Sequence, residues 1–231
     1  MLKAQIPVFL RKTLAEFIGS TFLAAAVVGS GIAAQRLSPG NIGLQLLENS
    51  LITGAALVAL ILSLGSLSSA FNPIVTIAER FFGVITTKSA ACFILAQILG
   101  CSLGVIIANL MFALPAINLS NHQRLAHGFW LGEVVATFGL LIIIFGTVRS
   151  GRSVHLPYAV GGYITAAYWF TSSTSFANPA ITIGRTLSDT FAGIAPASAP
   201  IFILMQMIGG LLAIAALLLL YPIPLRKQGN L

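Results

Sequence analysis

The stretch FNPIVTIAER, residues Phe71–Arg80, returns in close form later in the chain as FANPAITIGR, residues Phe176–Arg185. In register, the triplet Asn72-Pro73-Ile74 aligns with Asn178-Pro179-Ala180, and each triplet is followed by a β-branched residue and then Thr-Ile. A shared phrase of this length predicts an internal duplication. It also raises a structural question, because each copy falls where the apolar sequence around it favours an unbroken helix.

The composition is that of a membrane protein. Of the 231 residues, 57% are hydrophobic and only 7% are charged, and the mean hydropathy is +0.98. Too little polar surface remains to cover a soluble globule. The first apolar run is too long for a cleaved signal peptide, so we expect a retained helix. Six runs approach the ~20 residues of a membrane span, the fifth being short: Leu14–Ala34, Leu47–Gly65, Ala90–Leu114, Phe129–Val148, Leu156–Phe170 and Ile201–Tyr221.

The first spans of the two halves also resemble one another. LAEFIGSTFLAAAVVGSG begins at Leu14 and LGEVVATFGLLIIIFGTV at Leu131, and each carries one acid near its start, Glu16 or Glu133. Three spans per half is an odd number, so the halves must cross the membrane in opposite directions. We therefore predict an all-α membrane protein with an inverted 3+3 repeat, in one transmembrane domain over residues 1–231. The first repeat covers residues 1–115 and the second, inverted repeat residues 128–231.

Each Asn-Pro phrase is predicted to begin a half-helix. About ten residues of helical character follow, ending near Gly83 or Ser188, and they span roughly 15 Å, half the hydrocarbon thickness. Proline suits the first helical position, and the preceding asparagine is a good N-cap. Two half-helices that enter from opposite faces would meet at the middle and complete a seventh, broken span.

Helix N-termini at the membrane centre explain why the phrase occurs twice. Their unpaired N–H groups and positive dipole ends are tolerated only in buried protein or beside a water-filled cavity. Two such ends repel cations and protons, while the amides of Asn72 and Asn178 can donate to a passing oxygen. The arrangement predicts a passive channel for neutral hydroxylated solutes in single file.

The formal charge of +7 is explained by membrane topology rather than by an anionic or nucleic-acid partner. With both termini cytoplasmic, most basic residues lie on the cytoplasmic side and three remain for the other face, namely Arg36, Arg124 and Arg185. The cytoplasmic set is Lys3, Arg11, Lys12, Arg80, Lys88, Arg149, Arg152, Arg226 and Lys227.

On these residues the chain resembles the aquaporin and aquaglyceroporin family, the major intrinsic proteins, whose hallmark is two Asn-Pro-Ala motifs on inverted half-helices. The resemblance covers nearly the whole chain and implies a homotetramer of membrane channels for water and small neutral solutes, without a cofactor or enzymatic activity. Short loops favour a prokaryotic inner membrane. The first motif departs from the family in Ile74, which either displaces Asn72 or only repacks a neighbour; we favour repacking.

The second motif departs at Ile181, where many water-selective members have an arginine. By spacing from the two asparagines, the other constriction positions are Ile52, Ala166 and Ser175. This set has no histidine, aromatic ring or arginine, so we expect a constriction wider and more apolar than a strict water filter. A strictly water-selective channel is the alternative.

Arg185 lies one helical turn beyond Ile181 and has two interpretations. It is either a displaced filter arginine or the partner of Asp189 in an i,i+4 salt bridge, which we favour. The surrounding stretch NPAITIGRTLSDTFAGI resembles a bacterial branch of the family found with arsenic-resistance genes. Undissociated arsenite is therefore a candidate solute.

Glu16 and Glu133 lie in apolar spans, where an ionisable group is costly. They could relay protons in a secondary transporter, but their symmetry favours a structural role, accepting hydrogen bonds from the irregular backbone before each half-helix. His122 and His127 form only a weak metal signal, and we expect no metal site. His155 could gate the inner mouth, and Cys92 and Cys101 are too far apart along one helix for a disulfide.

Overall fold

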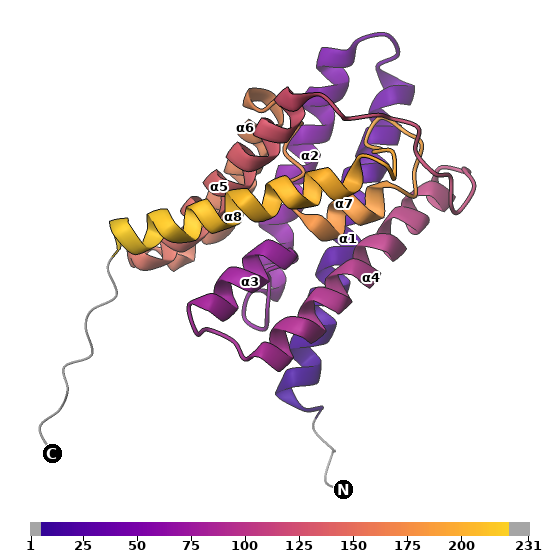
Figure 1. Cartoon of the computed structure of the whole chain (residues 1–231). Coiled ribbons are helices and arrows are strands. Elements are labelled where there is room, and N and C mark those ends of the chain that lie inside the picture. Colours follow the sequence, from indigo (N-terminus) through magenta and orange to yellow (C-terminus); the bar gives the residue numbers. More distant parts are fainter. Residues whose placement is uncertain (1–5, 222–231) are drawn as a thin grey trace, which may run out of the picture.

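The computed structural model describes residues 6–221 as a bundle of helices (Figure 1). Lys3, Arg226 and Lys227, which the topology prediction uses, lie outside the described residues. The helices, in chain order, are α1 (Val8–Leu37), α2 (Ile42–Leu64), α3 (Pro73–Phe81), α4 (Thr87–Met111), α5 (His127–Arg149), the short 3-10 helix η1 (Ser153–His155), α6 (Leu156–Phe170), α7 (Pro179–Arg185) and α8 (Ala199–Leu220). The order of two long helices, a half-helix and another long helix occurs twice.

Five helices between residues 6 and 221 are long and apolar enough to cross a membrane, namely α1, α2, α4, α5 and α8. The fifth predicted span, α6, has only 15 residues, or about 22 Å at 1.5 Å per residue. It ends at Phe170, and the run Thr171-Ser172-Ser173-Thr174-Ser175 follows. Thr171 donates to the carbonyl of Ala167, and the Ser173 hydroxyl accepts the N–H of Ser175. Such bonds between side chains and nearby backbone compete with helix continuation.

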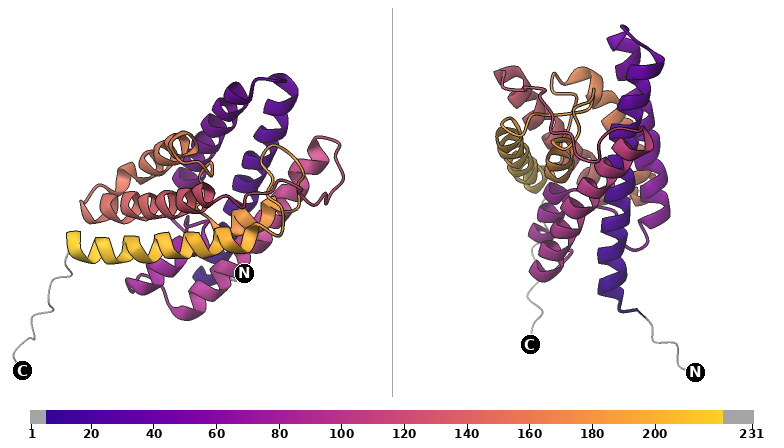
Figure 2. Two further views of the ribbon diagram at one scale, coloured as in Figure 1. Left: turned by 45° about the horizontal axis from the view of Figure 1, so that its top comes forward. Right: turned by 90° about the vertical axis from the view of Figure 1, so that its right-hand side faces the viewer.

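The long helices pack through small residues. Helix α1 lies beside α2 and α4, and α5 lies beside α6 and α8 (Figure 2). A side chain at Gly100 or Gly104 of α4 would collide with the carbonyl oxygens of Phe17 or Thr21 on α1. Gly209 of α8 meets the carbonyl of Val134 on α5 in the same way. Close backbone approach at small residues is a common way for helices to associate in lipid.

The half-helices α3 and α7 begin at the prolines, as predicted, and end a few residues earlier than expected, at Phe81 and Arg185. Each packs against a helix of the other repeat: α3 against α8, and α7 against α4. In α3, Ile74 is buried against Gly210 of α8, whose missing side chain leaves room for it. The extra bulk of Ile74 is thus accommodated by its neighbour, while Asn72 remains the N-cap of α3.

Candidate conduction pathway

The two motif asparagines bind the opposite repeat. The Nδ2 amide of Asn72 donates to the carbonyl of Ala177 at 2.7 Å, and that of Asn178 donates to the carbonyl of Phe71 at 2.7 Å. Each Oδ1 accepts N–H groups from the first turn of its own half-helix, from Ile74 or from Ala180 and Ile181. An amide has two N–H groups, so each asparagine retains one beyond this bond.

The residue before each asparagine has a strained backbone. Phe71 has φ 48° and Ala177 φ 49°, the left-handed region that costs a side-chain-bearing residue roughly 1–2 kcal/mol. Two buried acids hold these turns. Glu16 accepts the N–H groups of Ala70 and Phe71 at 2.9 and 2.7 Å. Glu133 accepts those of Phe176 and Ala177, both at 2.9 Å.

One glutamine completes each of the two supports, and sequence reasoning missed both glutamines. Gln97 on α4 donates to Glu16 at 2.7 Å and to Thr76 of α3 at 2.8 Å. Gln206 on α8 donates to Glu133 at 2.6 Å and to Thr182 of α7 at 2.9 Å. The available signal was a glutamine in the first half of the third span of each repeat. Each carboxylate is bonded to backbone and amide donors, and neither lines the cavity described next.

A cavity of about 110 Å³ passes between the half-helices. One buried water needs about 10–15 Å³ of such space, so the cavity has room for a short file of waters. Asn72 and Asn178 both line it. Most of the remaining wall is apolar, made by Leu23, Val27, Leu57, Ile61, Ala70, Phe71, Val75, Leu140, Ile144, Leu156, Val160, Ile164, Phe176 and Ile181.

Polar side chains gather at the end of the cavity that is nearest to the C-terminus of α7. We call this end the outer end. The Thr53 hydroxyl lies 3.2 Å from the Tyr168 hydroxyl, and both side chains are buried. Ser175 is buried and its hydroxyl has no partner among the described residues. Arg185 completes the group, with its guanidinium 3.4 Å from the ring centre of Phe176.

Comparison with known proteins agrees with this architecture. The family model for major intrinsic proteins matches residues 3–175. Aquaglyceroporin AqpS of Rhizobium meliloti (strain 1021) is 44% identical over 206 residues, which cover 89% of this chain and 88% of that protein. The chain belongs to the major intrinsic protein family. Aquaporin AqpM of Methanothermobacter marburgensis is 30% identical, over 88% of this chain and 94% of that protein.

The fold has a solved counterpart. The aquaglyceroporin from Plasmodium falciparum aligns with a TM-score of 0.70, covering 90% of this chain and 95% of that chain, at 20% identity. At this identity the match shows a shared fold. The family and the all-helical fold that the two motifs predict are thereby confirmed. This major intrinsic protein is a passive channel for water and small neutral solutes, and not an enzyme.

Two of the four spacing-derived constriction positions do not reach the cavity of this major intrinsic protein. Ile52 is 45% exposed on the outside of α2, and Ala166 is exposed on α6, whereas Thr53 and Tyr168 line the cavity. One residue turns a helix by about 100°, so an error of one or two positions moves a side chain from the cavity to the lipid face. Ser175 and Ile181 do line the cavity. The cavity wall beside them also contains the ring of Tyr168 and the guanidinium of Arg185, and a constriction wider and more apolar than a strict water filter stays a prediction.

The favoured pairing of Arg185 with Asp189 is also wrong. Helix α7 ends at Arg185, so the i,i+4 geometry is not continued to Asp189. The Nε of Arg185 donates to the carbonyl of Ala192, and the side chain is buried beside the cavity. Asp189 accepts bonds from the backbone and side chain of Asn121 at 2.9 and 3.1 Å. The backbone bond from Asn121 is the main cause that lowers the pKa of Asp189, and His122 lies 3.8 Å away.

The remaining candidates lie away from the cavity. His127 packs against Trp130, with ring centres 4.7 Å apart, and no cluster of three metal-ligating side chains occurs within residues 6–221. His155 is exposed in η1. Cys92 and Cys101 are both free thiols on α4.

Proposed function

We propose that this chain is an aquaglyceroporin-type channel that lets water, glycerol-like polyols and undissociated arsenite pass down their gradients. The observation that carries the proposal is the pair Asn72 and Asn178, whose amides line the cavity from opposite half-helices. A solute oxygen accepts a hydrogen bond from the free N–H of each asparagine amide in turn. A cation in the same place meets only donors and two positive helix ends, which do not replace its hydration shell.

In this proposal the selectivity constriction consists of Thr53, Tyr168, Ser175, Ile181 and Arg185. Four of them supply hydrogen-bonding groups, and Ile181 supplies an apolar wall. The Nε of Arg185 donates to the carbonyl of Ala192. The two terminal nitrogens of the guanidinium are therefore left to donate into the cavity. A polyol has a hydroxyl side and a carbon side, and this wall matches both. Undissociated arsenite is a small hydroxylated solute that uses the same groups.

The relatives support both the leading function and its alternative. AqpS is named an aquaglyceroporin, and it shares 44% of aligned residues with this chain. AqpM is named an aquaporin. A strictly water-selective channel is therefore the second candidate, favoured by the polar bulk of Tyr168 and Arg185 at the outer end of the cavity.

We place the channel in a prokaryotic inner membrane, with both termini cytoplasmic, as a homotetramer embedded in lipid. Relatives from a bacterium and an archaeon support the prokaryotic setting. Basic residues at the start of α1 and α4 and at the ends of α3 and α5 support the orientation, since cytoplasmic loops are enriched in Lys and Arg. Exposed apolar side chains, such as Leu51, Trp169 and Phe170, supply surfaces for lipid and for neighbouring subunits.

The test is stopped-flow light scattering on liposomes that contain the purified protein. After a sucrose shock we expect fast shrinkage by water loss. After glycerol or arsenite shocks we expect fast shrinkage followed by fast re-swelling as the solute enters. Shrinkage without re-swelling would support the strict water channel instead. Accumulation of solute above equilibrium under an imposed ion gradient would indicate a secondary transporter, because a channel only equilibrates its solute.

Adjacent residues on α2 provide a matched pair of variants. Thr53→Phe places a ring in the constriction, so glycerol re-swelling should slow at least tenfold. Ile52→Phe adds the same ring to the lipid-facing side and should leave the rate within twofold of the wild type. Equal slowing by both variants would contradict the proposed constriction.

A further inference from the structure

One charged side chain in the cavity wall has no part in the function described so far. Glu79 lies on α3 and faces the cavity together with Asn72 and Val75, which have the helical spacing of one face. It is half-buried. Among the residues that line the cavity, it is the single acid, and within the described chain no basic nitrogen lies within 4.0 Å of its carboxylate.

At the outer end and in the middle of the pathway the groups nearest the cavity are positive, and the acids Glu16 and Glu133 lie behind the wall rather than in it. Arg185 and Arg124 have guanidinium carbons 3.4 and 5.0 Å from the ring centre of Phe176, and α3 and α7 point their positive N-termini at the middle. This field repels cations. It also attracts anions, which accept the same hydrogen bonds as a neutral hydroxyl oxygen. The donors by themselves therefore do not discriminate against anions.

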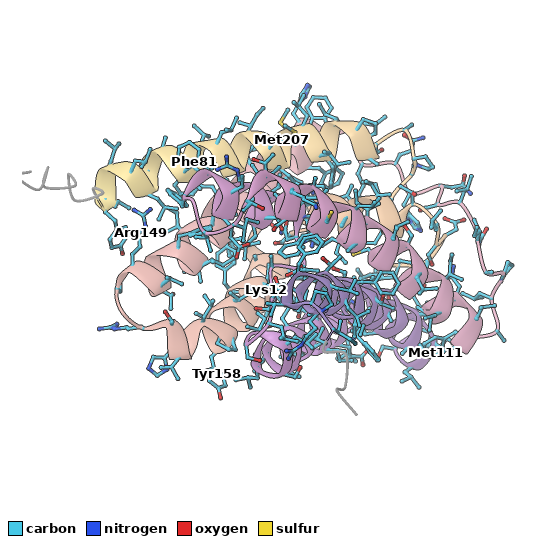
Figure 3. All side chains as sticks on the ribbon, turned by 90° about the horizontal axis from the view of Figure 1, so that it is seen from below. Lys12, Phe81, Met111, Arg149, Tyr158 and Met207 are labelled. Atoms are coloured by element: carbon cyan, nitrogen blue, oxygen red, sulfur yellow. The ribbon has the colours of Figure 1, made fainter. Side chains whose placement is uncertain are left out.

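The inner end, where α3 and α5 end and α1 begins, has basic residues around it as well. Lys12 on α1 and Arg149 at the end of α5 are labelled in Figure 3, which views the molecule from this side. Arg80 is exposed at the end of α3 and donates to Thr87 at 2.7 Å. Such residues concentrate anions at a pore mouth. The apolar wall just inside, made by Ile61, Ile144, Leu156 and Val160, contains no charge that opposes their entry.

We propose that Glu79 is a specificity-determining residue that excludes anions from the inner half of the pore. Its carboxylate stands beside the carbonyl end of α3, which carries partial negative charge, so both act in the same direction. When it is ionised, as at pH 8, a carboxylate in the wall of a narrow cavity repels an anion strongly, because water screening is weak there. A neutral polyol does not experience this repulsion. The inference rests on the proposed function.

The test measures anion and neutral-solute fluxes on the same liposomes at pH 8. Chloride uptake is read from quenching of an encapsulated chloride-sensitive dye, with K⁺ and valinomycin to balance charge. We expect Glu79→Gln to raise the chloride uptake rate at least tenfold over wild type. Glu79→Asp, which keeps the charge, should resemble wild type. Glu48→Gln removes an acid outside the cavity wall and should also resemble wild type.

Water and glycerol fluxes separate failure of this inference from failure of the function. Glu79→Gln is nearly isosteric, and we expect both neutral fluxes to stay within twofold of wild type. Chloride uptake that is unchanged in Glu79→Gln, with neutral fluxes intact, would overturn the anion-exclusion role and leave the channel function standing. Absent glycerol flux in the wild type would overturn the proposed function itself.

Discussion

At the scale of single residues, the channel depends on buried polar side chains that hold the two half-helices in place. The Asn72 and Asn178 amides bridge the repeats, and Glu16 and Glu133 hold strained turns beside them. A buried carboxylate without partners would be very costly in an apolar bundle. In each half a glutamine donates to the acid and to the motif threonine, and these bonds offset the cost of burying the acid.

The support residue Gln206 offers a test at this scale. Gln206→Met keeps the shape but removes the side-chain amide that donates to Glu133 and to the Thr182 hydroxyl. A hydrogen bond to a buried charged group is worth about 1.5–3 kcal/mol, so the variant should melt at a clearly lower temperature in detergent and lose water permeability. Gln123→Met, in the exposed linker, is the control and should melt like wild type. Equal melting of both variants would show that the amide is dispensable.

At the scale of elements, the half-helices are too short to be stable by themselves. Helices α3 and α7 have 9 and 7 residues, and isolated helices below about 12–15 residues are marginal in water. Their N-caps, their prolines and their packing against α4 and α8 stabilise them instead. The contact of Ile74 with Gly210 is the point where α3 meets α8.

This contact predicts a rescue. A Cβ atom at Gly210 would lie 2.5 Å from Cγ2 of Ile74, a stiff β-branched side chain, so Gly210→Ala should cost about 1–3 kcal/mol by overpacking. Adding Ile74→Ala should restore most of the loss. Gly162→Ala, on α6 with open space around its Cβ, should match or exceed wild-type stability. Thermal melting of the four proteins in detergent measures this, and a double variant no better than Gly210→Ala would refute the contact.

At the scale of the whole molecule, the two repeats are interleaved rather than merely adjacent. Each half-helix packs on a long helix of the other repeat, and each motif asparagine donates to a carbonyl of the other repeat. A single repeat would leave a half-helix end and its backbone groups unsatisfied inside the bilayer.

Interleaving predicts that the repeats are stable only together. Residues 1–115 and 128–231, expressed as separate tagged chains, should each be degraded when expressed alone. Expressed together, they should copurify and show water permeability above that of empty liposomes. The readouts are the amount of each chain in isolated membranes and affinity copurification. A single repeat that accumulates to the level of the pair would contradict the interleaved packing.

The sequence by itself determined the membrane class, the inverted repeat, the family and the Asn-Pro half-helices. These follow from local signals, since hydropathy, capping and proline position act over a few residues. Only the tertiary structure decided which side chains form the wall: Thr53 and Tyr168 rather than Ile52 and Ala166, and Arg185 on Phe176 rather than on Asp189. It also brought Gln97 and Gln206 to the acids and Glu79 to the cavity. The physical reason is that these contacts depend on the rotation of each helix and the path of each loop, which packing sets across distant parts of the chain.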